Sequence, residues 1–241
     1  MSEVFDVDSV VLDIEGTTSA TGFVVDVLYP YSRSRFGALL SQRSGDPDVA
    51  RAVAQVRELT GDPDADAGAV EKALNTWLDE DRKATPLKTL QGIIWAEGFA
   101  RGDLVSHFYD DVVPALRRWH AAGVRLHVYS SGSVAAQRAW FRSSPEGDLL
   151  PLVEELYDTE NPGPKQEPDS YRTIAAALGR RADPGRLLFL SDRPGELDAA
   201  RAAGWRTVGV RRPGEPYYEQ GVGDHAQAGT FDEITITRSI T

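Results

Sequence analysis

Residues that could act on a phosphate group occur in four short stretches of the chain. They are Asp13 with Glu15, Ser130 with Ser131, Lys165, and Asp192. Carboxylates can bind a metal ion, attack phosphorus or exchange protons. Hydroxyl groups and an ammonium group can hold an anion. The four stretches together therefore contain the parts of a phosphate-processing site.

The carboxylates divide into two groups by their expected roles. Asp13 and Asp192 offer the hard oxygen ligands that suit Mg²⁺, which binds a few carboxylates together with waters and phosphate oxygens. A carboxylate is also a competent nucleophile toward phosphorus. Glu15 lies two residues after Asp13, close enough to protonate a leaving oxygen and then to activate water. Ser130, Ser131 and Lys165 would bind the anion.

Each stretch also has a simpler explanation when it is taken alone. An acidic residue after a strand is commonly a turn former or a helix cap. The run Ser130–Ser133 (SSGS) is equally typical of a helix cap, and an isolated lysine is usually solvated. Asp192 and Glu196 would favour the start of a helix through its dipole. The order of the four stretches, each at the end of an expected strand or in a loop beside it, favours a site.

Strands alternate with helices over most of the chain. The apolar run Ser9–Leu12 predicts a buried parallel strand that ends at Asp13. The stretches 116–131 and 197–212 each predict a helix that ends at a glycine and is followed by a strand, and 187–190 predicts a further strand. This alternation predicts an α/β fold with a doubly wound parallel sheet. The carboxyl ends of its strands would present the candidate residues at one edge.

The segment from about residue 19 to residue 104 interrupts this alternation. It contains helical patterns over 49–59, 69–78 and 87–99, with a polar turn region at 61–68 and no convincing strand. We therefore expect a Rossmann-like core built from residues 1–18 and 105–241. A helical cap domain, residues 19–104, would be inserted after the first strand.

Composition excludes several classes of protein. The chain has 241 residues and a formal net charge of −11, which opposes binding to nucleic acid. The absence of cysteine excludes disulfides, thiolate metal sites and a cysteine nucleophile. No apolar run indicates a membrane span, and the acidic N-terminus does not resemble a secretory signal. We expect a cytoplasmic protein, and a monomer because no long apolar surface stripe is evident.

Other catalytic and binding motifs fail on inspection. The sequence has no phosphate-binding G-x-x-x-x-G-K-[ST] loop, no G-x-G-x-x-G fingerprint and no G-x-S-x-G elbow. Residues 158–169 imitate a calcium-binding loop only faintly, because two prolines and a terminal aspartate contradict it. The histidines have no metal-binding spacing, and His120 and His127 are interpreted as structural.

The order of these residues resembles the haloacid-dehalogenase-like phosphohydrolase superfamily over nearly the whole chain. Within it, the sequence is most similar to the enolase-phosphatases of methionine salvage, because Asp13-Ile-Glu-Gly-Thr-Thr18 has glutamate where most phosphatases of the superfamily have a second aspartate. The stretches 128–137, 163–165 and 189–192 support the resemblance. Tyr29-Pro30-Tyr31 and the stretch 87–92 support it as well.

The resemblance implies a Mg²⁺-dependent enzyme with one metal ion per chain. It would enolise 2,3-diketo-5-methylthiopentyl-1-phosphate and then remove its phosphate to give an acireductone. Asp13 would be the nucleophile and a metal ligand, Asp192 a second ligand, and Glu15 a ligand through its backbone carbonyl and an acid and base through its side chain. Ser130 and Ser131 would hold the substrate, and Lys165 would bind phosphate and neutralise Asp13.

The alternative that remains open is a general sugar-phosphate or phosphoglycolate phosphatase with the same core. A phosphate-binding module without activity is disfavoured because Asp13, Glu15, Lys165 and Asp192 are all present. Dehalogenation is disfavoured because hydrolysis of a carbon–halogen bond needs no metal, whereas Asp192 and Glu15 indicate a metal site. The base for enolisation is unassigned among Glu15, Lys165 and a cap residue such as Lys88. The sequence also leaves open whether Glu196 approaches the metal site or only caps a helix.

Overall fold

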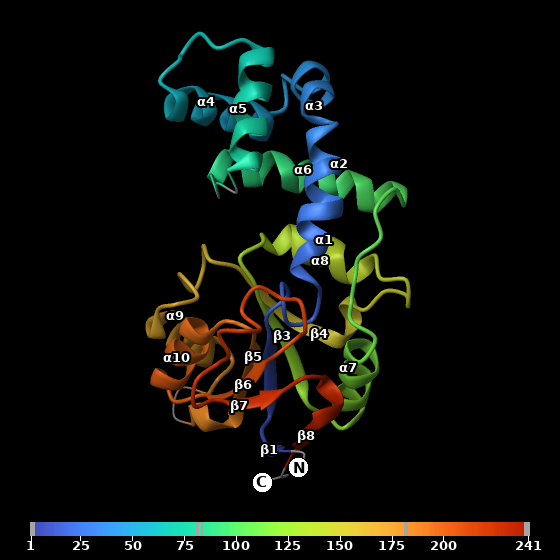
Figure 1. The fold of residues 1–241 in the computed structure, drawn as a ribbon, viewed down its shortest axis with the longest axis vertical. Helices are drawn as coiled ribbons and strands as arrows, with labels where there is room; N and C mark the ends of the chain where they lie inside the picture. Colours follow the sequence, from blue (N-terminus) through green and yellow to red (C-terminus); the bar gives the residue numbers. More distant parts are fainter. Residues whose placement is uncertain (1–2, 81, 83, 181–182, 239–241) are drawn as a thin grey trace. The chain divides into compact units, whose positions relative to one another are not determined.

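The computed structural model describes residues 3–80, 82, 84–180 and 183–238. The chain forms two compact units, one made of Met1–Gly22 and Val105–Thr241 and the other of Phe23–Leu104 (Figure 1). The sequence predicts domain boundaries after residues 18 and 104, and the compact units divide after residues 22 and 104.

A six-stranded parallel sheet forms the centre of the first unit and confirms the predicted α/β class. Its strands, in spatial order, are β4 (Val153–Tyr157), β3 (Arg125–Tyr129), β2 (Ser9–Leu12), β5 (Leu187–Ser191), β6 (Arg206–Val210) and β7 (Ala226–Ala228). The chain runs from β2 to β3 and β4 on one side, and then to β5, β6 and β7 on the other. The carboxyl end of β2 is thus the point where the direction of winding changes, which is where ligands bind in open α/β sheets.

A separate two-stranded parallel sheet joins the ends of the described chain. It consists of β1 (Glu3–Asp6) and β8 (Ile234–Thr237). The strand that the sequence analysis counted as the first is therefore the second along the chain. The pattern did not reveal β1, because its partner β8 lies more than two hundred residues away and the pairing is entirely non-local.

Helices cover both faces of the main sheet (Figure 1). They are α7 (Val112–Ala121), α8 (Val134–Arg142), α9 (Pro168–Ala177) and α10 (Pro194–Ala202), with short 3₁₀ turns η2 (Leu150–Leu152), η3 (Pro184–Arg186) and η4 (Phe231–Glu233). Gly123 and Gly204 follow the ends of α7 and α10 with φ of +79° and +88°. These left-handed positions confirm the predicted helix stops, because glycine adopts them without strain.

The regular elements of the second unit are all helical, and its described residues contain no strand. The three helices expected from the sequence are α4 (Pro47–Thr60), α5 (Ala67–Asp79) and α6 (Thr85–Arg101). Shorter helical segments precede them: α1 (Thr21–Phe23), which begins before the unit, the π-helix η1 (Val24–Leu28), α2 (Tyr29–Arg33) and α3 (Phe36–Gln42). Asp46 and Asp66 cap α4 and α5 by accepting backbone N–H groups.

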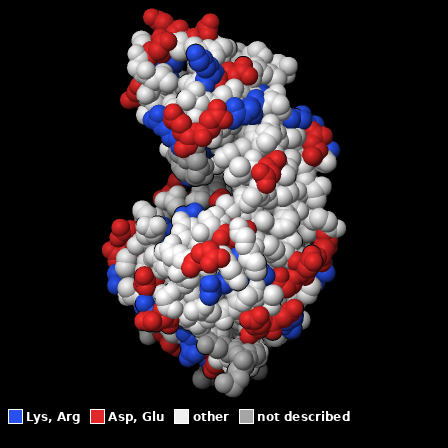
Figure 2. Space-filling model, viewed as in Figure 1, with Lys and Arg blue, Asp and Glu red and all other residues white. Residues whose placement is uncertain are grey.

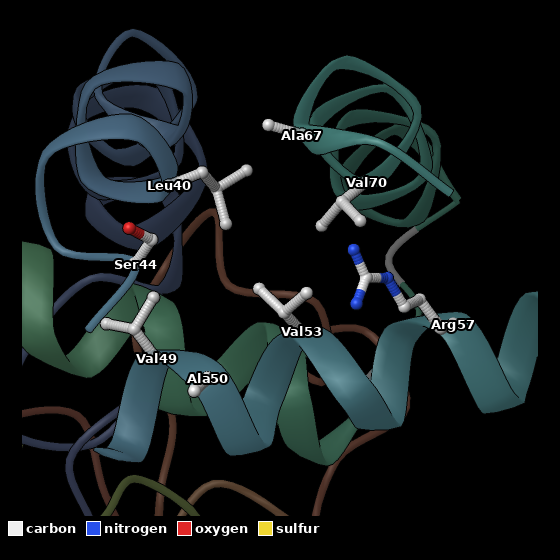
Figure 3. A pocket seen from close by; sticks show the side chains of 8 residues that line it. All are labelled: Leu40, Ser44, Val49, Ala50, Val53, Arg57, Ala67 and Val70. Carbon is white, nitrogen blue, oxygen red and sulfur yellow. The ribbon is translucent and has the colours of Figure 1, made fainter. Parts of the chain in front are cut away.

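A pocket of about 250 Å³ lies between α3, α4 and α5 (Figure 3). Its lining is mainly apolar and includes Leu40, Val49, Val53 and Val70. The charged residue of the lining is Arg57, whose guanidinium Nε and Nη2 donate to the Ala65 carbonyl at 3.0 and 2.8 Å. Among the described residues, no helix combines the length and apolar character needed to cross a membrane.

Candidate active site

Asp13 follows β2 and lies at the carboxyl edge of the sheet. Its backbone N–H donates to the Leu190 carbonyl of β5 at 2.9 Å, which continues the β2–β5 pairing past the end of the strand. Its side chain is buried, and its Oδ1 accepts a hydrogen bond from Lys165 Nζ at 2.6 Å. Asp13 and Lys165 therefore form a buried ion pair.

Lys165 is 7% exposed, so the simpler reading of a solvated lysine is wrong. Its Nζ lies 2.6 Å from Asp13 Oδ1 and also 2.6 Å from Glu196 Oε2. Burial by itself lowers the pKa of Lys165, but the charges of the two carboxylates outweigh burial and raise the pKa above its ordinary value. The ammonium group stays charged and compensates two buried carboxylates.

The turn that carries Lys165 is held by hydroxyl groups from the sheet and from α9. Tyr129 donates to the Gly163 carbonyl at 2.7 Å, Ser170 to the Pro164 carbonyl at 2.7 Å, and Tyr171 to the Lys165 carbonyl at 2.8 Å. Gly163 has a φ of +113°. A Cβ atom there would lie 2.7 Å from Ser170 Oγ, so the turn requires glycine. These contacts aim the lysine at Asp13.

Asp192 follows β5 and is the second carboxylate at this edge. Its side chain is 4% exposed, and its buried Oδ1 has no hydrogen-bond partner among the described residues. Burial, and then the charge of Asp13, raise its pKa to about 8. A Cβ atom on Gly16 would lie 2.2 Å from Asp192 Oδ2, so the turn after Asp13 passes directly against this carboxylate. A buried oxygen without a protein partner and a raised pKa fit a carboxylate that binds a cation.

The donor set at this edge fits Mg²⁺. Among the residues that the structure describes, no group of three or more His, Cys, Asp or Glu side chains is arranged to hold a metal ion. The predicted ligands Asp13 and Asp192 both offer oxygen donors. Magnesium commonly binds one or two carboxylates and completes its octahedron with waters and substrate phosphate oxygens. Two carboxylates beside an anion site therefore suit this ion better than a full protein cage would.

Glu196 is a site residue that the sequence analysis left undetermined. It lies in the first turn of α10 and is buried. Its Oε2 lies 2.6 Å from Lys165 Nζ and accepts a hydrogen bond from Ser191 Oγ at 3.0 Å. Burial raises the pKa of Glu196, while Lys165 lowers it, and the balance is a raised pKa. Its position four residues after Asp192 was the available signal, but the sequence could not show its contact with Lys165.

The predicted substrate-binding serines lie at the same edge through strand pairing. β2 pairs with β3 in parallel, and Ser130 directly follows β3. Ser130 is buried and donates its backbone N–H to the Tyr157 carbonyl at 3.1 Å, whereas Ser131 is exposed. The last serine of the run 130–133 is the helix cap that the run alternatively predicts. Ser133 caps α8 by accepting the Ala136 N–H at 3.3 Å.

Glu15 lies two residues beyond Asp13, in the turn that leaves β2. Its backbone pairs with Ser19 in an isolated bridge, and its side chain is half-buried. The side-chain contacts described above join Asp13, Lys165 and Glu196, and Asp192 faces Gly16. Glu15, Ser130 and Ser131 are brought to this edge by the backbone.

A carboxylate after a central strand, a buried lysine joined to it and a second acidic strand end are features of a hydrolase of the haloacid-dehalogenase type. Residues 4–204 match the family model for haloacid dehalogenase-like hydrolases. The fold agrees, since the structure of UTR4 protein from Saccharomyces cerevisiae is similar with a TM-score of 0.76 and 29% identity, over 94% of this chain and 99% of that one.

Relatives with higher sequence identity define the family within these hydrolases. Enolase-phosphatase E1 from Streptomyces avermitilis is 88% identical over 99% of both chains. Enolase-phosphatase E1 from Frankia alni is 52% identical over 93% of this chain and 94% of its own length. The chain belongs to the enolase-phosphatase E1 family of haloacid-dehalogenase-like hydrolases.

Proposed function

We propose that this chain is the Mg²⁺-dependent enolase-phosphatase of methionine salvage. It converts 2,3-diketo-5-methylthiopentyl-1-phosphate to 1,2-dihydroxy-3-keto-5-methylthiopentene, an acireductone, and phosphate. The observation that carries the proposal is the buried pair of Asp13 and Lys165, 2.6 Å apart, beside the unpartnered Oδ1 of Asp192. The names of the relatives support the two activities, enolase and phosphatase, and the substrate is the one that the family resemblance of the sequence implies.

One Mg²⁺ per chain would be held by Asp13, Asp192 and the backbone carbonyl of Glu15. When bound, the ion supplies positive charge that neutralises the phosphate oxygens during transfer. Its binding would also give the buried Oδ1 of Asp192 the partner that it lacks. Lys165 supplies the second positive charge, so a dianionic phosphate meets a positive focus within an acidic protein.

Phosphate transfer begins with attack by Asp13. Its Oδ1 is engaged by Lys165, which leaves Oδ2 to form the bond to phosphorus while the bond from phosphorus to the substrate oxygen breaks. Glu15 donates a proton to that leaving oxygen. Water, activated by the Glu15 carboxylate, then attacks phosphorus and releases inorganic phosphate, which regenerates Asp13. Ser130 and Ser131 hold the phosphate through hydroxyl and backbone donors.

The direct test supplies the purified protein with the diketone phosphate and Mg²⁺. Enol formation is followed by its ultraviolet absorbance, and phosphate release is followed in the same sample. We expect both signals with this substrate. Phosphate release from sugar phosphates or phosphoglycolate with no enol signal from the diketone would favour the general phosphatase instead.

The remaining parts of the proposal concern the state of the protein. The substrate is a small phosphorylated diketone, with no role for nucleic acid or a membrane. We infer a monomer that works in the cytoplasm. Light scattering during size-exclusion chromatography measures the mass directly, and a value near 26.3 kDa is expected.

A further inference from the structure

The segment 16–22, which follows Glu15 and ends at the boundary of the first unit, is folded tightly against its own start. The backbone N–H groups of Thr17, Thr18 and Ser19 all donate to the Ile14 carbonyl, at 3.2, 3.0 and 2.9 Å. Gly16 N–H donates to the Ser19 carbonyl at 2.7 Å, and Glu15 pairs with Ser19. The position of Ser19 therefore determines the backbone course at Glu15.

His107 holds this segment from outside. It lies in the connection before α7, far from Ser19 in the sequence, and its ring is half-buried. Its Nδ1 accepts the Ala20 N–H at 3.2 Å and lies 3.2 Å from Ser19 Oγ. The Tyr109 ring packs edge-on against it with ring centroids 5.3 Å apart, and Tyr109 N–H donates to the Thr18 carbonyl at 3.1 Å. The His107 imidazole thus contacts two successive residues, Ser19 and Ala20, of the segment that follows Glu15.

The contact with Ala20 determines the protonation state of the imidazole. A backbone N–H can only donate, so Nδ1 must carry a lone pair and the proton of the neutral ring must lie on Nε2. Protonation of His107 would place an N–H against the Ala20 N–H and break the contact. The same nitrogen would also lose its ability to accept from the Ser19 hydroxyl.

We infer that His107 is a positioning residue for the acid and base Glu15, acting through Ser19 and Ala20 as a hydrogen-bond acceptor. This inference rests on the proposed function, since it assumes the catalytic role of Glu15. The linkage runs from His107 Nδ1 to Ser19 and Ala20, and from the Ser19 backbone to Glu15 and Gly16. Because Gly16 packs against Asp192, displacement of the turn would also disturb the second carboxylate.

The surroundings of His107 favour its neutral form. Burial opposes protonation more strongly than the nearby negative charges favour it. Desolvation lowers the pKa of His107, while the negative charges of Asp110 and Glu215 raise it, and the net direction is a lowered pKa. Glu215 is itself engaged, because it accepts the Thr21 N–H and the Tyr109 hydroxyl. The acceptor state of His107 is therefore the form present at neutral pH and above.

Two substitutions of His107 distinguish the role of the hydrogen-bond acceptor Nδ1 from the role of the packed ring. His107→Ala removes both, whereas His107→Asn keeps an oxygen near the place of Nδ1 and cannot take up a proton in this pH range. His120→Ala and His120→Asn are matched controls, because His120 is an exposed histidine on α7. Hydrogen–deuterium exchange of residues 16–22 gives a readout that does not depend on activity.

In the exchange experiment at pH 7.5, His107→Ala is expected to lower protection of residues 16–22 by about tenfold or more, since the opening of a segment costs less once its anchoring contact is lost. His107→Asn should recover most of that protection, and the His120 variants should match the unsubstituted protein. Unchanged protection in His107→Ala would overturn the inference whether or not Glu15 is catalytic.

In kinetics with the diketone phosphate, His107→Ala should lower kcat on the order of ten- to a hundredfold with little change in KM, because a misplaced acid and base slows the chemical step more than binding. His107→Asn should restore most of the kcat and should lose less activity between pH 7.5 and pH 5.5 than the unsubstituted protein. Equal defects in both variants would overturn the acceptor role. Lost protection with unchanged kcat, alongside an active Glu15→Gln, would locate the failure in the proposed function.

Discussion

At the scale of single residues, the site depends on one buried cation shared by two carboxylates. Lys165 lies 2.6 Å from both Asp13 and Glu196, and all three are nearly inaccessible. A buried charge without compensation is costly, so each member of the cluster constrains the others. Asp13 is the member whose second oxygen is left for chemistry.

Asp13→Asn should abolish turnover while leaving the fold intact. The amide has nearly the same shape, but it is a far weaker nucleophile and a weaker metal ligand, so we expect kcat to fall on the order of 10⁴-fold or more. Phosphate release measures this loss, and circular dichroism checks the fold. Activity near that of the unsubstituted protein would remove Asp13 as the nucleophile.

Glu15→Gln should separate the two roles proposed for Glu15. Ligation through the backbone carbonyl survives the substitution, so Mg²⁺ affinity should stay within about threefold while kcat falls by about a hundredfold or more, as expected for loss of acid–base catalysis. Titration calorimetry gives the affinity. A large loss of Mg²⁺ binding would show that the side chain, and not the carbonyl, is the ligand.

Lys165→Met should destabilise the protein because two buried carboxylates would lose their shared cation. We expect the free energy of unfolding to fall by about 3–5 kcal/mol in the absence of Mg²⁺. Urea denaturation measures it, with the exposed Lys72→Met as the control for loss of a lysine. A loss under about 1 kcal/mol would mean that the carboxylates are protonated or solvated once Lys165 is removed.

At the scale of elements, the strands differ in how plainly the sequence shows them. β2 and β5 are buried at every position and were predicted from their apolar runs. β4 was not predicted, because Glu154 and Glu155 interrupt its apolar pattern. It is an edge strand of the sheet, where exposed charges are tolerated and block unwanted pairing. Very short strands such as β7 and β8, of three and four residues, also leave little periodic signal.

β3 contains a buried histidine that should make the stability of the protein depend on pH. His127 is fully buried, and within the part of the chain that the structure describes neither ring nitrogen has a hydrogen-bond partner. Burial, and then the charge of Arg125, lower its pKa from 6.5 to about 4. The folded state therefore binds fewer protons than the unfolded state between these values, so its contribution to stability is complete above pH 6.5 and is lost as the pH falls toward 4.

The loss from His127 alone should reach about 3 kcal/mol by pH 4. His127→Leu should remove this part of the pH dependence, whatever its effect on stability at pH 7. Urea midpoints of the two proteins at pH 7 and pH 4.5 test the prediction. Parallel shifts in both proteins would show that His127 does not titrate in this range.

At the scale of the whole molecule, the net charge of −11 opposes the approach of a phosphorylated substrate. Acidic and basic side chains are interspersed on the face that Figure 2 shows, so no large patch there offsets the charge. The positive charge of Lys165, together with the proposed Mg²⁺, acts only at short range. At low salt the repulsion extends over about 30 Å, and at physiological salt over about 8 Å.

Raising the ionic strength from about 10 to 150 mM should therefore increase kcat/KM by about two- to threefold, with Mg²⁺ kept saturating. Initial rates at low substrate concentration measure the effect. A fall in kcat/KM with salt would mean that the local positive field of the site, and not the net charge, governs substrate capture.

The sequence by itself determined the α/β class, the helical insertion and the identities of Asp13, Lys165 and Asp192 at strand ends and in a loop. These follow from local patterns, because burial periodicity and glycine stops lie within short stretches. Only the tertiary structure decided that Glu196 shares Lys165 with Asp13, and that His107 anchors the turn behind Glu15. Such contacts join residues tens to about 150 positions apart. No local pattern contains them, since they arise only when the sheet brings its carboxyl ends together.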